Sequence, residues 1–311
     1  MNSVVHWEKD TAPLGAAVAA IGVFDGVHVG HQALVGHAAA DARKRGMQCV
    51  AVTFDRDPDQ VVTPDTSAPQ LLTLDDKSRF LLEAGADLVL VIPFDAELAA
   101  RAPSDFLEHV LLAALSPRAV HVGLDFRFGH FAEGNVATLR GAGEHMGFSV
   151  HAHELVESGG EPVTSTRIRA LIAAGDVAEA SVLLGRHHRV TGRVVHGQGI
   201  GRALLHIPTA NLLPTEHAAL PADGVYAGWA CVGPAKHPAA LSVGLPPTFP
   251  GARDRLEAHI IDLTDDLYGQ TLTVGFARYI RQQHRFDSDE DLAAAIRCDI
   301  ATIRDDDLDR E

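Results

Sequence analysis

The first half of the chain alternates short apolar runs with longer segments that have helical spacing. The apolar runs predict buried strands at residues 17–24, 48–54, 87–92, 118–122 and 148–153. The segments with apolar residues three or four positions apart predict helices at residues 33–46, 71–84, 103–115 and 134–147. Strands that alternate with helices indicate an α/β fold, in which helices cover both faces of a parallel sheet.

The pattern changes near residue 185, after two predicted helices at 167–174 and 176–184. Short strands then alternate with Gly and Pro turns, at residues 189–195, 224–232, 239–244, 255–263 and 271–276. Such a run is typical of an antiparallel barrel or sandwich. An amphipathic helix is expected at the end, over residues 287–304. Since 311 residues suit two domains, we expect them at residues 1–185 and 186–311.

Charge and cysteine content narrow the class of protein. The formal net charge of −15 argues against a nucleic-acid partner, because such proteins carry a basic face. No apolar run reaches the length of a membrane span, so no membrane association is expected. Cys49, Cys231 and Cys298 lie far apart without CxxC spacing, which argues against disulfides and a structural zinc site. We expect a cytoplasmic protein; the sequence leaves its oligomeric state open.

Two histidines follow the first predicted strand. His28 and His31 are three residues apart, so they share one face of a first helical turn, and Gly30 lets a phosphate approach the backbone. The helix N-terminus supplies free N–H groups and a positive dipole end. Adenylyl transfer needs donors around the α-phosphate and no protein nucleophile. The segment indicates a nucleotidyltransferase, although a turn with chance histidines is the alternative in a chain with 18 of them.

A second segment opens the predicted helix at 167–174 with hydroxyl groups. Thr164, Ser165 and Thr166 precede Arg167, and a hydroxyl residue there is commonly only a helix cap. Hydroxyls, amides and guanidinium groups together can also hold the β- and γ-phosphates of ATP. Both interpretations stay open on these residues alone.

Residues 123–130 read GLDFRFGH, with two aromatic rings on either side of Arg127. Such a loop can pack a flat ring between Phe126 and Phe128. The alternative is a pair of phenylalanines that face the core after a strand.

The second half holds a glycine-rich segment with Gly197, Gly199, Gly201 and Arg202, followed by Thr209 and Asn211. Glycine-rich loops can wrap phosphates with backbone N–H groups. A hydroxyl and an amide carbonyl are hard oxygen ligands of the kind that Mg²⁺ prefers. This segment is not a Walker A motif, because GxxxxGK[ST] is absent.

Strand alternation in residues 255–259 places Glu257 and His259 on one face. A carboxylate that faces a pocket could take the proton from a hydroxyl that attacks a γ-phosphate. An ordinary solvent-facing strand edge is the alternative.

Taken together, GVFDGVHVGH at 22–31, VGLDFRFGH at 122–130 and TSTRIR at 164–169 resemble the bacterial bifunctional riboflavin kinase/FMN adenylyltransferase (FAD synthetase) family. The resemblance implies a Rossmann-like nucleotidyltransferase domain in which His28 and His31 stabilise the α-phosphate as catalytic residues with Arg167. It implies ATP contacts at Gly22, Phe24, Asp25, Gly26, Gly30, Thr164, Ser165 and Thr166. Flavin contacts are implied at Phe54, Asp125, Phe126, Arg127 and Phe128.

Residues 186–304 resemble the riboflavin kinase module, through GR…HG.G.GR…PTANL, PADGVYAG and EAHIIDL. The resemblance implies a six-stranded antiparallel β-barrel with a C-terminal helix, Mg²⁺–ATP contacts at Thr209 and Asn211, and Glu257 as catalytic base. The nucleotide would also contact Gly197, Gly199, Gly201 and Arg202, and the flavin would contact Arg278, Arg281 and Phe286. The implied ligands are riboflavin, FMN, FAD, ATP and Mg²⁺. Alternatives are a specialised paralogue with one activity lost, one acting on a flavin analogue, or a non-catalytic flavin or nucleotide sensor.

The chain departs from the family pattern at three places. Asp57 stands where the family usually has His, and a carboxylate there weakens binding of an anionic flavin unless Mg²⁺ or Arg56 compensates. The 203–207 loop is one residue longer than usual, and Pro246 replaces an Asn amide.

Overall fold

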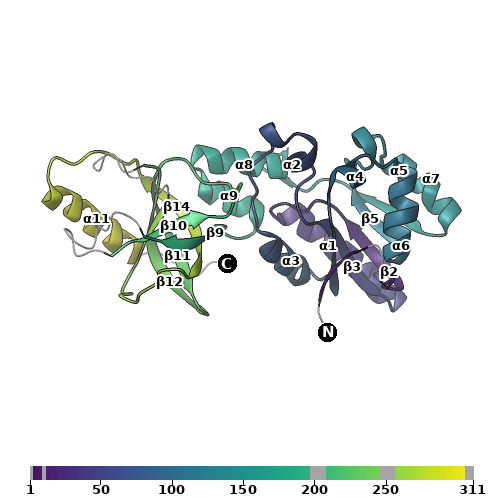
Figure 1. Cartoon of the computed structure of the whole chain (residues 1–311), viewed down its shortest axis with the longest axis horizontal. Helices are drawn as coiled ribbons and strands as arrows, with labels where there is room; N and C mark the ends of the chain where they lie inside the picture. Colours follow the sequence, from purple (N-terminus) through teal and green to yellow (C-terminus); the bar gives the residue numbers. More distant parts are fainter. Residues whose placement is uncertain (1–2, 9–11, 197–207, 246–255, 305–311) are drawn as a thin grey trace. The chain divides into compact units, whose positions relative to one another are not determined.

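The computed structural model describes residues 3–8, 12–196, 208–245 and 256–304. The chain divides into two compact units, Met1–Thr164 and Ser165–Glu311 (Figure 1). Helices α8 (Ser165–Ala174) and α9 (Val177–Leu184) open the second unit, and Val177 joins the core of that unit. A domain boundary at residues 185/186 stays a prediction. Among the described residues, none of the helices combines the length and apolar character that a bilayer crossing requires.

The first unit is built on a six-stranded sheet with the order β1-β4-β3-β2-β5-β6. Every pair in it is parallel, as predicted. The short strand at the β1 edge was not predicted, because three residues carry too little periodicity. The strands are β1 (Val4–His6), β2 (Ala16–Ile21), β3 (Gln48–Phe54), β4 (Leu88–Ile92), β5 (Ser116–Gly123) and β6 (Ser149–His153).

The order of the strands reverses at β2. From β2 the chain proceeds outward to β3 and β4 on one side, and the later strands β5 and β6 lie on the other. In open α/β sheets, ligands bind beyond the carboxyl ends of the strands at such a switch point. The loops that follow β2 and β5 are therefore the expected ligand-binding edge.

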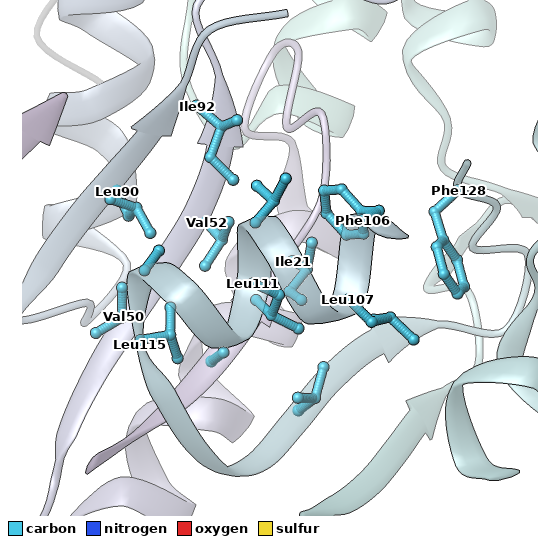
Figure 2. Close-up of a cluster of buried hydrophobic side chains, with 14 of the residues drawn as sticks. Ile21, Val50, Val52, Leu90, Ile92, Phe106, Leu107, Leu111, Leu115 and Phe128 are labelled. Carbon is cyan, nitrogen blue, oxygen red and sulfur yellow. The ribbon is translucent and has the colours of Figure 1, made fainter. Parts of the chain in front are cut away.

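Helices cover both faces of this sheet. Ala17, Ala19 and Ile21 of β2 pack into one apolar cluster, whereas Val18 and Ala20 pack into the other. The first cluster includes residues from the segment after β4 (Figure 2), and the second includes residues of α1 and α3. The predicted helix at 103–115 is interrupted by a π-helical turn, η2 (Leu107–Leu111).

The remaining elements of the first unit are α1 (Val29–Arg45), α2 (Asp59–Val62), η1 (Pro64–Thr66), α3 (Leu74–Glu83), α4 (Ala96–Ala99), α5 (Pro103–Phe106), α6 (Leu112–Ala114), η3 (His130–Ala132), α7 (Val136–Met146), and the hairpin β7 (Glu157–Ser158) and β8 (Glu161–Pro162). Helix α1 ends at Gly46, whose left-handed φ of 65° caps it as the sequence predicted.

The second unit contains a closed six-stranded barrel with the order β10-β13-β12-β11-β14-β9. All neighbouring pairs are antiparallel, which confirms the expected barrel. Helix α11 (Asp289–Arg304) follows the barrel, and its Ile303 packs with Ala227 and Ile261. The strands are β9 (His188–Val195), β10 (Ala210–Pro214), β11 (Gly224–Val232), β12 (Ala235–Val243), β13 (Leu256–Ile260) and β14 (Thr271–Arg281).

Candidate active sites

The chain turns sharply between β2 and α1. Gly26 has φ of 82°, and two residues with side chains, Phe24 and Val27, also have positive φ values of 56° and 37°. Residues other than glycine rarely adopt this backbone region, and they do so where the surrounding structure enforces it. Phe24 and Val27 are almost fully buried in the cluster under α1. Core packing therefore holds the turn that presents the two histidines.

His28 and His31 lie together at the start of α1. His28 is the N-cap of the helix, and its Nδ1 accepts a hydrogen bond from the His31 N–H at 3.3 Å. The two rings stack with centroids 3.6 Å apart, which confirms the shared face. Because Nδ1 accepts, the proton of a neutral His28 ring is on Nε2, where it can be donated to an oxyanion.

Two glycines in this segment stand at close approaches. A Cβ on Gly30 would lie 3.1 Å from the His28 ring, and one on Gly22 would lie 2.9 Å from the Phe24 ring. A side chain at either position would displace the neighbouring ring. Gly30 therefore allows the ring stack as well as access to the helix amides.

Asp25 holds this turn to the segment before α3. Both of its carboxylate oxygens accept from the Leu71 N–H at 3.1 Å, and the side chain is buried. This hydrogen bond ties the loop after β2 to the segment before α3 at the carboxyl edge of the sheet. The ATP contacts expected from Gly22, Phe24, Asp25 and Gly26 stay predictions.

A buried lysine that the sequence reasoning missed lies beside the same turn. Lys77 Nζ donates to the backbone oxygens of Val23 at 3.2 Å and Phe54 at 3.1 Å, and it lies 4.0 Å from Asp57 Oδ1. Burial lowers the pKa of Lys77, and the nearby carboxylates of Asp57 and Asp25 oppose this shift. Lys77 lies one helical turn before Phe80 and Leu81, so its place on the apolar face of α3 was the available signal.

Lys77 changes the interpretation of Asp57. The expected compensating cation was Arg56 or Mg²⁺, but the Arg56 guanidinium pairs with Asp55 at 3.0 Å. Asp57 instead has the Lys77 ammonium group as a neighbour, and both side chains are almost fully buried. The negative charge of Asp57, which stands where the family usually has a histidine, is thus offset by a buried lysine of the protein itself.

The loop after β5 combines buried and exposed residues. Phe128 is buried in the core and Phe126 is partly buried, with ring centroids 5.5 Å apart. Asp125 and Arg127 are exposed, and Arg127 Nη1 donates to the Phe126 carbonyl at 3.0 Å. Phe54, at the end of β3, is buried against Phe94. The flavin contacts predicted for these residues remain untested, and Asp125 and Arg127 are the more accessible ones.

The TSTRIR segment spans the division between the two units. Thr164 ends the first unit, while Ser165, Thr166 and Arg167 open α8, which begins two residues before the predicted start at 167. Arg167 Nη2 lies 3.8 Å from Glu179 Oε1 of α9. The phosphate-binding role of this segment stays a prediction.

The barrel brings Asn211 and Glu257 together. They are Cα partners across the antiparallel pair β10–β13, so their side chains share a face. Leu256 and Ala258 are buried in the barrel core, whereas Glu257 is half-buried. His259 shares the face of Glu257, and its Nδ1 donates to the Pro208 carbonyl at 2.8 Å. The predicted strand alternation is confirmed.

Arg281, expected at the flavin, has a structural partner in the barrel unit. Its Nη2 lies 2.8 Å from Asp299 Oδ2 and its Nε 3.1 Å from Asp299 Oδ1, which ties β14 to α11. Its guanidinium carbon also lies 5.7 Å from the centroid of the Phe286 ring. Arg278, on β14 opposite Ala227, is half-buried. Gly197, Gly199, Gly201, Arg202, the 203–207 loop and Pro246 lie outside the described residues.

Comparison with known proteins supports two catalytic modules. A family model for FAD synthetase matches residues 10–167, and one for riboflavin kinase matches residues 184–306. The bifunctional riboflavin kinase/FMN adenylyltransferase of Escherichia coli K12 is 36% identical over 94% of this chain and 93% of its own length. The enzyme of the same name from Pseudomonas fluorescens is 37% identical over 92% of each chain.

A solved structure also matches along almost the whole chain. A crystal structure from Streptococcus pneumoniae that bears the name macrolide-efflux protein has a TM-score of 0.85 and 30% identity. The match covers 97% of this chain and 99% of that one. The two matched modules follow one another in the same order as the α/β sheet and the barrel. The chain therefore belongs to the bifunctional riboflavin kinase/FMN adenylyltransferase family.

Proposed function

We propose that the two reactions of this bifunctional enzyme are carried out by separate residue sets. Phosphorylation of riboflavin would use Thr209, Asn211 and Glu257 of the barrel. Adenylylation of the resulting FMN would use His28 and His31 at the start of α1. The observation that carries this division is the pairing of Asn211 with Glu257 in one unit, while the stacked histidines belong to the other.

In the kinase step, Glu257 accepts the proton of the riboflavin 5′-hydroxyl as that oxygen attacks the γ-phosphorus of ATP. The bond between this phosphorus and the β–γ bridging oxygen breaks, and ADP leaves. Thr209 and Asn211 offer a hydroxyl and an amide oxygen, a donor set that fits Mg²⁺. When bound, Mg²⁺ would offset phosphate charge. Asn211 is almost fully buried and lies opposite the base, so the proposed ligand and base occupy fixed strand positions.

In the adenylylation step, an oxygen of the FMN phosphate attacks the α-phosphorus of ATP. Pyrophosphate leaves, so the protein needs donors for the developing charge and no nucleophile. His28 supplies Nε2–H, the His31 ring supplies a second donor, and the amides of Val29 and Gly30 at the start of α1 supply further ones, because the His31 amide already donates to His28. We assign Thr164, Ser165, Thr166 and Arg167 to the phosphates that leave.

The test is chromatography of the products formed from riboflavin, ATP and MgCl₂ by the purified protein. FMN and FAD are both expected. FMN alone would indicate a paralogue without adenylylation, and neither product from riboflavin or its analogues would indicate a sensor. Because ATP is the co-substrate and the three cysteines lie far apart in the sequence without CxxC spacing, we place the enzyme in the cytoplasm.

A further inference from the structure

Five side chains with metal-binding chemistry converge in the first unit, away from the start of α1. His121 and His151 are Cα partners on β5 and β6, and His153 lies two residues further along β6 on the same face. His37 and Asp41 are four residues apart on α1, so they share a helix face. Helix α1 thus contributes a histidine and a carboxylate to the sheet face that carries the three strand histidines.

One distance in this cluster matches the spacing of two ligands on a metal ion. The gap between His121 Nε2 and Asp41 Oδ2 is 3.3 Å. Two ligand atoms each about 2.1 Å from a tetrahedral Zn²⁺ lie about 3.4 Å apart. One ligand atom from each of Asp41, His121 and His151 lies within 4.8 Å of the others. To reach the spacing of ligands on one ion the side chains would have to rotate, while Asp41 Oδ1 already pairs with Arg45 Nε at 2.9 Å and leaves Oδ2 on the histidine side.

We propose that Asp41, His121 and His151 bind a divalent transition metal, with Zn²⁺ as the first candidate. Two imidazoles and one carboxylate suit Zn²⁺, and water would complete a tetrahedral shell. Mg²⁺ is a poor fit, because it prefers oxygen ligands in octahedral geometry. The widely spaced cysteines argued against a structural zinc site, but they do not bear on these histidines.

His153 provides the outer partner that such sites use. His121 Nδ1 lies 2.9 Å from His153 Nε2. When His121 Nδ1–H donates to His153, the lone pair of His121 Nε2 is available to a metal beside Asp41. His37 stacks on His153 with centroids 4.7 Å apart, which restrains the ring of that partner.

The proposed metal site differs from the nucleotide site. Asp41 follows His28 by thirteen residues, about 20 Å along a helix at 1.5 Å per residue. A bound metal would join the middle of α1 to β5 and β6, and so would stabilise the helix that presents His28 and His31. Because the ion would bind the folded state, it would raise the unfolding temperature of this unit.

The test uses the full chain, stripped with EDTA and dialysed, then titrated with ZnCl₂ in excess MgCl₂. We expect one Zn²⁺ per chain at this site and an unfolding temperature about 5 °C higher at a hundredfold excess over the dissociation constant. His151→Ala and Asp41→Asn should each weaken binding at least tenfold. His145→Ala removes an exposed histidine of α7 in the same unit and should leave binding unchanged.

His28→Asn separates this site from the adenylylation site, and it should retain the zinc. FAD formation by His151→Ala without added zinc should equal that of the wild type. Zinc affinity therefore tests the metal site, and FAD formation tests the proposed catalytic roles separately. Wild-type affinity in both His151→Ala and Asp41→Asn would overturn the proposal. Loss of zinc in His28→Asn alone would also overturn it, because the ion would then belong to the stacked histidines.

Discussion

Asn211 and Glu257 are directly opposed on β10 and β13 of the barrel. Opposed residues of an antiparallel pair have Cβ atoms about 4.5–5.5 Å apart, on one face. A hydrogen-bonded ladder, not a loop, therefore fixes the spacing between the proposed base and the proposed oxygen ligand. Thr209 precedes Asn211 by two residues, so its hydroxyl can join the same face if the extended backbone continues.

Glu257→Gln is expected to reduce FMN formation from riboflavin by about 10²–10⁴-fold, because the amide cannot accept the hydroxyl proton. Conversion of supplied FMN to FAD should continue at the wild-type rate, since that reaction uses the other residue set. Both rates are measured by product chromatography. Glu216→Gln, at an exposed position of the same unit, is the matched control and should change neither rate. An unchanged kinase rate in Glu257→Gln would remove Glu257 as the base.

His28→Asn is expected to reduce FAD formation by about 10²–10³-fold while FMN formation from riboflavin continues. Asn is a good N-cap, so the substitution keeps the helix start and removes only the imidazole donor. His28→Ala removes both the N-cap acceptor and the imidazole donor. It should therefore also lower the free energy of unfolding by about 1 kcal/mol. Chromatography measures the amounts of FMN and FAD, and thermal unfolding measures the stability that is lost with the N-cap. Equal loss of FMN and FAD would contradict separate sites.

The strands of the fold were predictable where the apolar runs are long and continuous. Strand β3 was predicted at 48–54 and lies at Gln48–Phe54, since all but its first residue are buried. Strand β10 was not predicted from the pattern, because the polar Asn211 divides a short apolar run, although Ala210, Asn211 and Leu212 are all buried. The π-helical turn Leu107–Leu111 also escaped prediction, since the buried residues around it recur four positions apart, a spacing that an α-helix also gives.

The site was predictable where chemistry follows local spacing. The stacking of His28 and His31 follows from their three-residue separation on a helix. The contacts of Lys77 could not be predicted from local spacing. Its partners Val23, Phe54 and Asp57 come from other segments, which only the folded sheet edge brings together. The Arg281–Asp299 pair depends in the same way on how α11 packs.

Lys77→Met is expected to destabilise the first unit by about 3–5 kcal/mol. The substitution takes away the ammonium group beside the buried Asp57 carboxylate and two hydrogen bonds to backbone oxygens. Urea unfolding followed by Trp7 fluorescence, in a Trp229→Phe background, measures the change. Arg79→Met, an exposed basic residue of the same helix, is the control and should cost less than about 1 kcal/mol.

The double variant Lys77→Met/Asp57→Asn tests whether the two charges act as a pair. Neutralising Asp57 as well removes the buried charge that Lys77→Met leaves behind, so the double variant should be more stable than the sum of the single effects predicts. The coupling free energy from this cycle is the measured quantity. Additive effects would show that Lys77 stabilises the loops through the Val23 and Phe54 carbonyls alone.

His188 is expected to make the barrel less stable in acid. It is buried, its Nε2 donates to the Ala219 carbonyl at 2.8 Å, and burial lowers its pKa from 6.5 to about 4. As the pH falls from about 6.5 to about 4, the unfolded chain therefore gains a proton that the folded chain does not bind. This difference lowers the free energy of unfolding by about 3 kcal/mol across that window and has no effect above it.

His188→Gln keeps a donor near the Ala219 carbonyl and removes the titration. Between pH 7 and pH 4.5 the variant should lose about 2–3 kcal/mol less stability than the wild type, by urea unfolding followed through Trp229 in a Trp7→Phe background. His217→Asn, at an exposed barrel-unit position with φ of 64°, is the control, because Asn tolerates that backbone region. Its pH profile should follow that of the wild type. If the stability of His188→Gln instead fell with pH as steeply as that of the wild type, the folded barrel would bind the proton as readily as the unfolded chain. Burial would then not be what keeps His188 neutral.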